Sequence, residues 1–409
     1  MNRSFTLRSL LVFAFAAFGC SSGSNSASGD AGPPPGDAST DRTTTGDRDD
    51  DHDNLDAGNA FFDAEGCAVG DAGEPLDLRC TGLYSDWATK TVSPENQPYT
   101  PGLLLWSDGA GKKRWIYLPK GQKIDTSVMD EWTFPVGTRI WKEFSLPVSG
   151  ATASVRIETR LIWKLHDGFD GWYYTTYRWS ADGKTSATEN TAGELDANGA
   201  GYEVPSHDEC NECHKGREDF VMGFEALSLS LPAADGLAMA ALLDAGRLTA
   251  PPASNLAIPG DPTAAAALGW LHVNCGISCH NRGGGVAGAS GFLTRLDVAT
   301  LGSVQDTDTW TTGWNKPALK FTIPDAATSD VLHACSLATS AAYYRAAHRD
   351  GVDGDPAEAG IQMPTFDTHR VDIAGLALLA AWINEGCDAG SGDASSGTTD
   401  AGDASSAGD

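Results

Sequence analysis

Basic residues are scarce in this chain of 409 residues, which has 28 Lys and Arg against 55 Asp and Glu. The resulting net charge of −27 argues against nucleic-acid binding, which needs a basic surface to neutralise phosphates. The excess is uneven, because residues 21–60 and 388–409 together contribute −12 of it. The length still allows a buried core and about two to three domains.

Long apolar runs are also missing, so no segment is expected to span a bilayer. The nine apolar residues of 10–18 are too few for this and instead suit the core of a secretory signal. Arg3 and Arg8 precede this run, as is typical of such signals. The sequence therefore predicts export.

The apolar run ends at Gly19-Cys20 and is followed by a Ser/Gly stretch. This order resembles a bacterial lipoprotein signal, in which the cysteine is lipidated and becomes the mature N-terminus. The resemblance implies a signal peptide at 1–20, lipidation at Cys20 and a periplasmic or cell-envelope location, anchored to the outer membrane rather than the inner one. An ordinary cleaved signal with an incidental Cys20 is the alternative.

Residues 21–60 and 389–409 are rich in Gly, Ser, Asp and Thr and have little to bury. Such composition is typical of disorder, so we expect an acidic tether before the folded part and a tail after it. The word Gly-Asp-Ala-Ser occurs in both stretches, which indicates shared low-complexity spacers.

Residues 61–205 are expected to form a β-rich domain, because eight of the twelve tryptophans lie between Trp87 and Trp179. Apolar and polar residues alternate along 155–164, and a second aromatic run follows at 172–179. This pattern predicts antiparallel hairpins with one face covered, in a sandwich or partial barrel.

The pattern changes after residue 205 from alternation to helical spacing. Residues 227–243 and 262–271 are rich in Ala and Leu, with Pro232 expected to open the first helix. Near the end, 373–383 follow helical spacing, with Asp372 as cap and Gly386 as stop. The expected fold class is therefore α+β.

The motif Cys210-Asn-Glu-Cys213-His214 has the C-x-x-C-H spacing of covalent haem attachment. Two thiols at this spacing can reach the two vinyl groups of one porphyrin edge. The adjacent histidine then lies under the iron as a nitrogen ligand. Residues 206–260 are therefore expected to form a first haem segment.

A second motif, Cys275-Gly-Ile-Ser-Cys279-His280, has the same parts with one more residue between the cysteines. A helical segment precedes it, and Met363-Pro364 and a closing helix follow. This order is similar to that of monohaem cytochromes c, and the resemblance covers about 206–388. It implies a cytochrome c-like domain at 261–388, with His280 and Met363 as the two axial ligands.

The distal ligand of the first haem is left open among four candidates: Met222, Met239, His207 and His272. Two alternatives also remain for the cysteine pairs of the two motifs, namely a zinc site and disulfide bonds. Cys67 with Cys80 and Cys335 with Cys387 are expected to form disulfides, which together with two thioether pairs and Cys20 accounts for all nine cysteines.

The sequence thus predicts an exported, lipid-anchored protein with two covalent haems c, which transfers electrons between redox protein partners and is an electron carrier rather than an enzyme. One alternative is a dihaem peroxidase or oxidase-like enzyme with one open haem. Another is a lipoprotein whose β-domain binds a glycan or protein partner, with haem in a secondary role.

Overall fold

The computed structural model describes residues 67, 70, 74–283, 287–349, 360–365 and 367–389. The expected signal peptide at 1–20, the lipidation site Cys20 and the tether at 21–60 lie outside these residues and stay predictions. The expected tail at 389–409 also lies outside the described residues, except for Ala389, which is the last residue of a helix. Within the described ranges, no helix is long and apolar enough to cross a bilayer.

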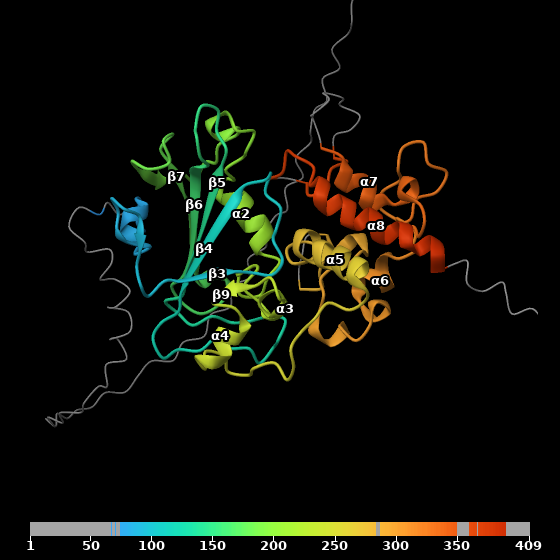
Figure 1. The fold of residues 1–409 in the computed structure, drawn as a ribbon, viewed down its shortest axis with the longest axis horizontal. Coiled ribbons are helices and arrows are strands. Elements are labelled where there is room, and N and C mark those ends of the chain that lie inside the picture. The colour runs from blue at the N-terminus through green and yellow to red at the C-terminus, as the bar shows by residue number, and fades with distance from the viewer. Residues whose placement is uncertain are drawn as a thin grey trace, which may run out of the picture. The chain divides into compact units, whose positions relative to one another are not determined.

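The largest element is one antiparallel sheet of seven strands in the order β8-β7-β6-β5-β4-β3-β9 (Figure 1). Its strands are β3 (Gln97–Thr100), β4 (Gly111–Tyr117), β5 (Arg139–Leu146), β6 (Val155–Lys164), β7 (Trp172–Trp179), β8 (Ala187–Glu189) and β9 (Asp235–Gly236). A separate hairpin consists of β1 (Tyr84–Asp86) and β2 (Thr91–Val92). The prediction of a β-rich region is confirmed in this coarse form, although β9 comes from beyond residue 205.

Both faces of the sheet are covered, whereas the sequence predicted one. Trp141 and Leu161 pack on one face in a cluster with Trp179. On the other face, Ile140 packs in a cluster with Phe224, because the chain after residue 218 folds back over this side. The prediction was wrong here since the alternation along β6 marks which residues share a face and not whether that face is open.

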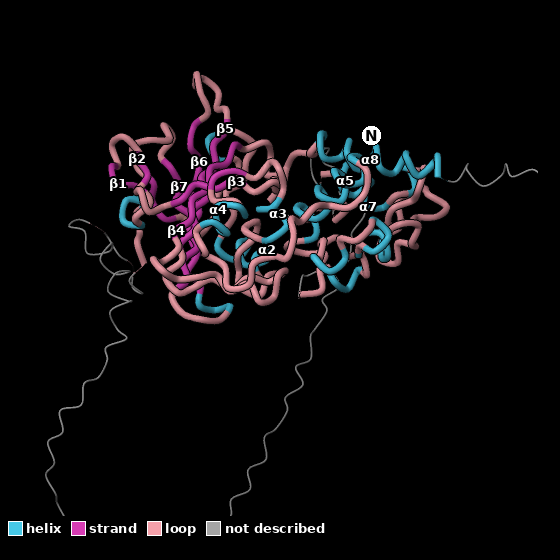
Figure 2. The backbone as a smooth tube through the Cα atoms, turned by 60° about the horizontal axis from the view of Figure 1, so that its bottom comes forward, coloured by secondary structure: helices cyan, strands magenta, loops and turns pink. Residues whose placement is uncertain are grey.

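Helices follow the sheet in the second half of the chain, and Figure 2 shows those nearest the C-terminus beside the strand-rich region. The α-helices are α2 (His207–His214), α3 (Ala226–Ser230), α4 (Met239–Asp244), α5 (Pro262–Leu271), α6 (Asp308–Gly313), α7 (Ala341–Ala347) and α8 (Ile373–Ala389). A π-helical turn, η4 (His272–Gly276), continues α5. Short 3₁₀ turns are η1 (Leu78–Thr81), η2 (Phe169–Gly171), η3 (Ala197–Gly199), η5 (Gly288–Ser290), η6 (Val298–Thr300), η7 (Val304–Asp306) and η8 (Leu337–Thr339).

The helix expected over 227–243 is instead broken into α3, β9 and α4. Pro232 lies in the turn after α3 and opens no helix. Gly236 has a φ of +70°, which is not a helical conformation, and it pairs with Tyr99 of β3. Tertiary pairing with the sheet therefore overrides the helical propensity of this stretch.

Helices α5 and α8 form a second core, in which Leu268, Leu271, Leu379 and Ile383 are buried together. Both helices begin where the sequence predicts, and the Asp372 side chain accepts a 3.0 Å hydrogen bond from the Gly375 N–H. The predicted stop at Gly386 was wrong.

Helix α8 continues to Ala389. A Cβ at Gly386 would lie 2.9 Å from the rings of Trp314 and from Ala334. The glycine at this position therefore allows close packing and does not mark the helix end.

Two disulfides tie the described chain and confirm both expected pairs. Cys67 and Cys80 are joined with a Cα–Cα distance of 5.6 Å. Cys335 and Cys387 are joined at 4.7 Å and link the end of α8 to the segment before α7.

The Cys335–Cys387 bond should contribute strongly to stability, because it closes a loop with a sequence separation of 52. We expect Cys335→Ala/Cys387→Ala to lower the free energy of unfolding by about 4 kcal/mol through the added entropy of the unfolded chain. Denaturant unfolding measures this, with Cys67→Ala/Cys80→Ala as the matched short-loop control. An equal loss in both variants would contradict the loop-length explanation.

Candidate functional site

The first cysteine pair lies on a well-capped helix. The Ser206 side chain and the Glu209 side chain form a capping box at the start of α2, with the Glu209 carboxylate accepting from the Ser206 N–H at 2.7 Å. Cys210 and Cys213 are one turn apart in this helix, so both side chains lie on one side of it. Both are free thiols in the structure.

His214, at the end of α2, is held in one tautomer. Its Nδ1 lies 2.6 Å from the carbonyl oxygen of Phe220, which can only accept, so Nδ1 carries the proton. The ring also stacks on the Phe220 ring at 4.5 Å between centroids. Burial lowers the pKa of His214 to about 4. The imidazole is therefore neutral at pH 7, with the Nε2 lone pair free for a metal.

The second motif begins in the π-helical turn η4, which follows α5 directly. The Ile277 N–H donates to the His272 carbonyl at 2.9 Å, and the His280 N–H donates to the Cys275 carbonyl at 2.8 Å. Both bonds span five residues instead of four. The wide turns absorb the extra residue between Cys275 and Cys279, and such π bulges are frequent at functional sites.

His280 repeats the arrangement of His214. Its Nδ1 donates to the Phe292 carbonyl at 2.8 Å, which again leaves Nε2 unprotonated. Burial lowers the pKa of His280 below its ordinary value. Cys275 and Cys279 are free thiols, like the first pair. The sequence predicted Cys275, Cys279 and His280 as site residues, but it did not indicate that both motif histidines donate hydrogen bonds to backbone carbonyls.

Both motifs open into one cavity of about 510 Å³. Its lining includes all six motif residues: Cys210, Cys213, His214, Cys275, Cys279 and His280. The two motifs also pack directly on each other, because a Cβ at Gly216 would lie 1.9 Å from the Ser278 carbonyl oxygen. Only glycine allows this approach without displacing the backbone.

Met363 lines the same cavity and also an adjoining one of about 120 Å³, which His280 shares. Its backbone N–H donates to the Arg345 carbonyl at the end of α7, at 3.0 Å. The structure thus brings Met363 and His280, which are far apart in sequence, to the same space.

Of the four candidates for a further ligand, Met222 lines the cavity, and its Sδ accepts from the Ser278 hydroxyl at 3.1 Å. Met239 packs instead in the hydrophobic core. His207 stacks on Tyr174 at 4.1 Å between ring centroids.

His272 uses both ring nitrogens. Its Nδ1 accepts from the Leu296 N–H at 2.9 Å, so its Nε2 carries the proton and donates to Glu225 at 2.8 Å. A histidine engaged in this way has no lone pair left for a metal.

The arrangement disfavours the zinc and disulfide alternatives. A structural zinc site needs four converging ligands. In the part of the chain that the structure describes, one set of three or more His, Cys, Asp or Glu has ligand atoms within 4.8 Å of one another, and it contains no cysteine. The four motif cysteines are also unpaired.

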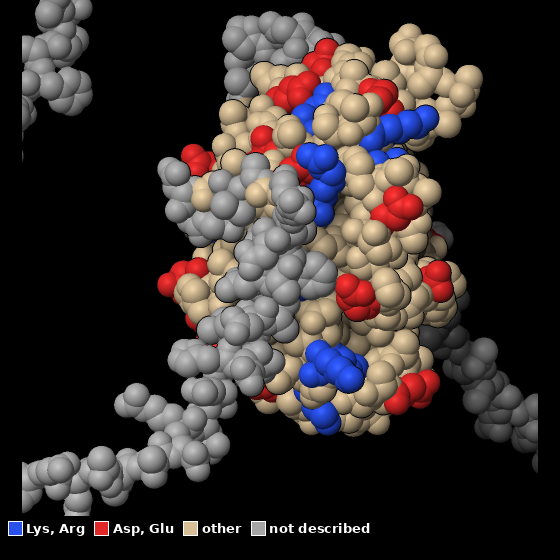
Figure 3. All heavy atoms as spheres, turned by 90° about the vertical axis from the view of Figure 1, so that its left-hand side faces the viewer, with Lys and Arg blue, Asp and Glu red and all other residues tan. Residues whose placement is uncertain are grey.

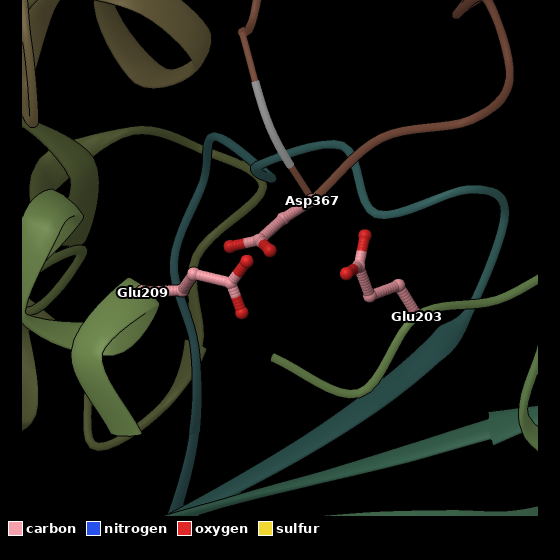
Figure 4. Close-up of side chains that lie close together, drawn as sticks. All are labelled: Glu203, Glu209 and Asp367. Carbon is pink, nitrogen blue, oxygen red and sulfur yellow. The ribbon is translucent and has the colours of Figure 1, made fainter. Parts of the chain in front are cut away.

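That set is Glu203, Glu209 and Asp367, whose carboxylates face one another at the cavity wall (Figure 4). Burial raises the pKa of Asp367 to about 6, and the charges of Glu209 and Glu203 add to this while Arg160 opposes it. Sequence reasoning missed this cluster, because Asp367 lies 158 residues after Glu209 in the chain.

A buried ion pair lies beside the motifs and gives a test of the local fold. Glu225 accepts from His272 and lies 3.6 Å from the Arg217 guanidinium. Burial alone would raise the pKa of Glu225, but His272, Arg217 and Arg295 outweigh it and lower this pKa well below its ordinary value.

We expect Glu225→Gln to lower the free energy of unfolding by about 3 kcal/mol at pH 7, because it removes one of the two carboxylates that pair with the buried Arg217 guanidinium. A carboxylate with a depressed pKa stabilises above its unfolded pKa of about 4.3, and this is lost as pH falls toward the folded value. The difference from the parent should therefore shrink below about pH 4. Denaturant unfolding at pH 7 and below about pH 4 measures the difference in free energy of unfolding between variant and parent, with Glu218→Gln at an exposed position as control. A difference that does not change with pH would contradict the ion-pair account.

Comparison with known proteins adds no relative: no family model, curated protein or solved structure matches this chain.

Proposed function

We propose that this chain is an exported c-type cytochrome with two covalently attached haems, which transfers electrons to or from redox protein partners and is anchored through Cys20 to a membrane of the cell envelope. The proposal includes a cytochrome c-like domain at 261–388 and a β-sandwich or partial β-barrel at 61–205.

One observation carries it. Two free thiol pairs, each followed by a histidine whose Nδ1 donates to a backbone carbonyl, line a single cavity. Neutral, oriented imidazoles are the form in which histidine binds a metal. This repeated arrangement has no evident purpose in a purely structural domain, since buried thiols and histidines add little that apolar residues would not.

Each of these residues would have a distinct role in binding haem. The two cysteine pairs would form the thioether bonds, and His214 and His280 would each hold an iron through Nε2. Met363 would offer a thioether ligand, which favours the reduced state and raises the potential. Haem iron, when bound, supplies a one-electron couple. The shared cavity would keep both groups close and largely away from water.

The charge of the body does not by itself select a partner. On the face shown in Figure 3, acidic and basic side chains are interspersed, so this face offers no docking patch of one sign.

A second candidate function is a dihaem peroxidase-like enzyme. It is favoured by Asp367, a carboxyl with a raised pKa at the cavity wall, which is suited to proton transfer.

Electron paramagnetic resonance of the oxidised full chain tests the two against each other. A carrier should show low-spin ferric signals only and be reduced reversibly, whereas a high-spin signal together with peroxide turnover would favour the enzyme. An Asp367→Asn variant should leave the carrier unchanged and should slow the enzyme.

A further inference from the structure

A row of three cations crosses the sheet at the cavity wall. Arg114 of β4 is the direct cross-strand partner of Lys142 of β5, and Lys142 is the partner of Arg160 of β6. All three residues line the cavity that contains both cysteine motifs. No local pattern in the sequence indicates this row, because its members are 28 and 18 positions apart along the chain.

Like charges directly opposite each other destabilise a sheet. Arg160 is neutralised by Glu158, whose carboxylate lies 2.7 Å from the guanidinium. Arg114 is buried and Lys142 is half-buried, yet within the described residues neither side chain has a hydrogen bond or an ion pair with a carboxylate. Two cations of the row therefore lack an anion.

The surroundings make this arrangement costly for the haem-free protein. Burial lowers the pKa of Lys142 well below its ordinary value, and the charges of Lys112, Arg114 and Arg160 lower it further. Three carboxylates also line this cavity. Glu203 accepts from His369 at 2.8 Å and Glu209 belongs to the capping box of α2. Asp367 lies close enough to Arg160 to feel its charge, but within the described residues it forms no ion pair with Arg114 or Lys142. An anion from outside the chain would relieve the repulsion.

An apolar row lies next to the cationic one. Ile116, Ile140 and Ile162 are cross-strand partners on the same three strands, two residues from the cations and therefore on the same face. Ile140 and Ile162 also line the cavity. The wall thus presents an apolar band beside a positive band, which suits a flat apolar molecule with carboxylates along one edge.

We propose that Arg114 and Lys142, beside the Arg160–Glu158 pair, bind the propionate carboxylates of haem held in this cavity, so that the β-domain forms part of the cofactor site. This inference rests on the proposed function. Guanidinium and ammonium groups make charge-assisted hydrogen bonds with carboxylates, and these are strong in a site that excludes water.

Replacing a cation of the row changes the charge felt by the haem. Without it, the propionates hold their protons more tightly and the oxidised iron is relatively stabilised. The midpoint potential should therefore fall, and the pH at which the potential responds to propionate titration should rise.

The test compares the full haem-loaded chain with its Lys142→Met and Arg114→Met variants, and with Lys113→Met as matched control. Lys113 is the exposed neighbour of Arg114 on β4 and points to the other face. Haem content by intact mass, midpoint potentials against pH and the propionate bands of redox-difference infrared spectra are measured.

Both cavity variants should keep full haem content, with a lowered potential, a pH response moved upward and shifted propionate bands, while Lys113→Met matches the parent. Full haem content with unchanged potentials and bands in both cavity variants would overturn this inference alone. A parent chain without covalent haem would overturn the proposed function and this inference with it. Two variants at different strands keep the test valid if one of them fails to fold.

Discussion

Met363→Ala should lower the midpoint potential of one haem strongly while leaving both haems attached. Thioether ligation opposite histidine raises the potential of haem iron, and its loss removes that effect. Met363 shares two adjoining cavities with His280, so the second haem is the one expected to respond. Potentiometric titration with optical detection measures the change, and the spectrum of the ferric protein should lose the features of a sulfur ligand.

Met239→Leu is the matched control, because Met239 packs in the hydrophobic core. It should leave both potentials in place. Met363→His should restore a six-coordinate, low-spin iron but not the high potential. Unchanged potentials in Met363→Ala would contradict the assignment of this ligand.

Each cysteine pair should account for one haem. We expect Cys210→Ala/Cys213→Ala and Cys275→Ala/Cys279→Ala to carry a single covalent haem each, because neither pair can replace the thioether bonds of the other. Intact mass measures this directly. Cys335→Ala/Cys387→Ala, which removes a disulfide at a different place, should keep both haems.

Replacement of Cys275 and Cys279 is the more informative of the two experiments, because their spacing differs from that of the usual attachment motif. If this replacement leaves the haem content of the chain unchanged, the additional residue between Cys275 and Cys279 prevents attachment, and the wide turn at η4 would then have another role.

Features that depend on neighbouring residues were predicted well from the sequence. The starts of α5 and α8 and the alternation along β6 are local patterns of this kind. The disulfide pairs were also predicted correctly, from proximity in sequence for Cys67 and Cys80 and from their positions on either side of the Met363 loop for Cys335 and Cys387.

What failed depends on contacts between distant segments. The stretch around Pro232 has helical composition, but pairing of Gly236 with Tyr99 places part of it at the edge of the sheet. Gly386 was predicted to end the last helix, whereas glycine at this position allows the close approach of Trp314. In both cases tertiary packing decided between conformations that local propensity leaves close in free energy.

The candidate site divides in the same way. The cysteines and histidines could be named from spacing, whereas the carbonyl partners of His214 and His280 lie 6 and 12 residues further on and have no side-chain signal. The cationic row and the acidic set with Asp367 arise only when the strands are in register and the loop after Met363 is in place.

Haem stoichiometry tests the central claim most directly. The full chain is produced together with a cytochrome c maturation system, and its intact mass is measured alongside a pyridine haemochrome assay. The account predicts two haems per chain, both covalently attached. A chain of the unmodified mass with no haemochrome spectrum would contradict it.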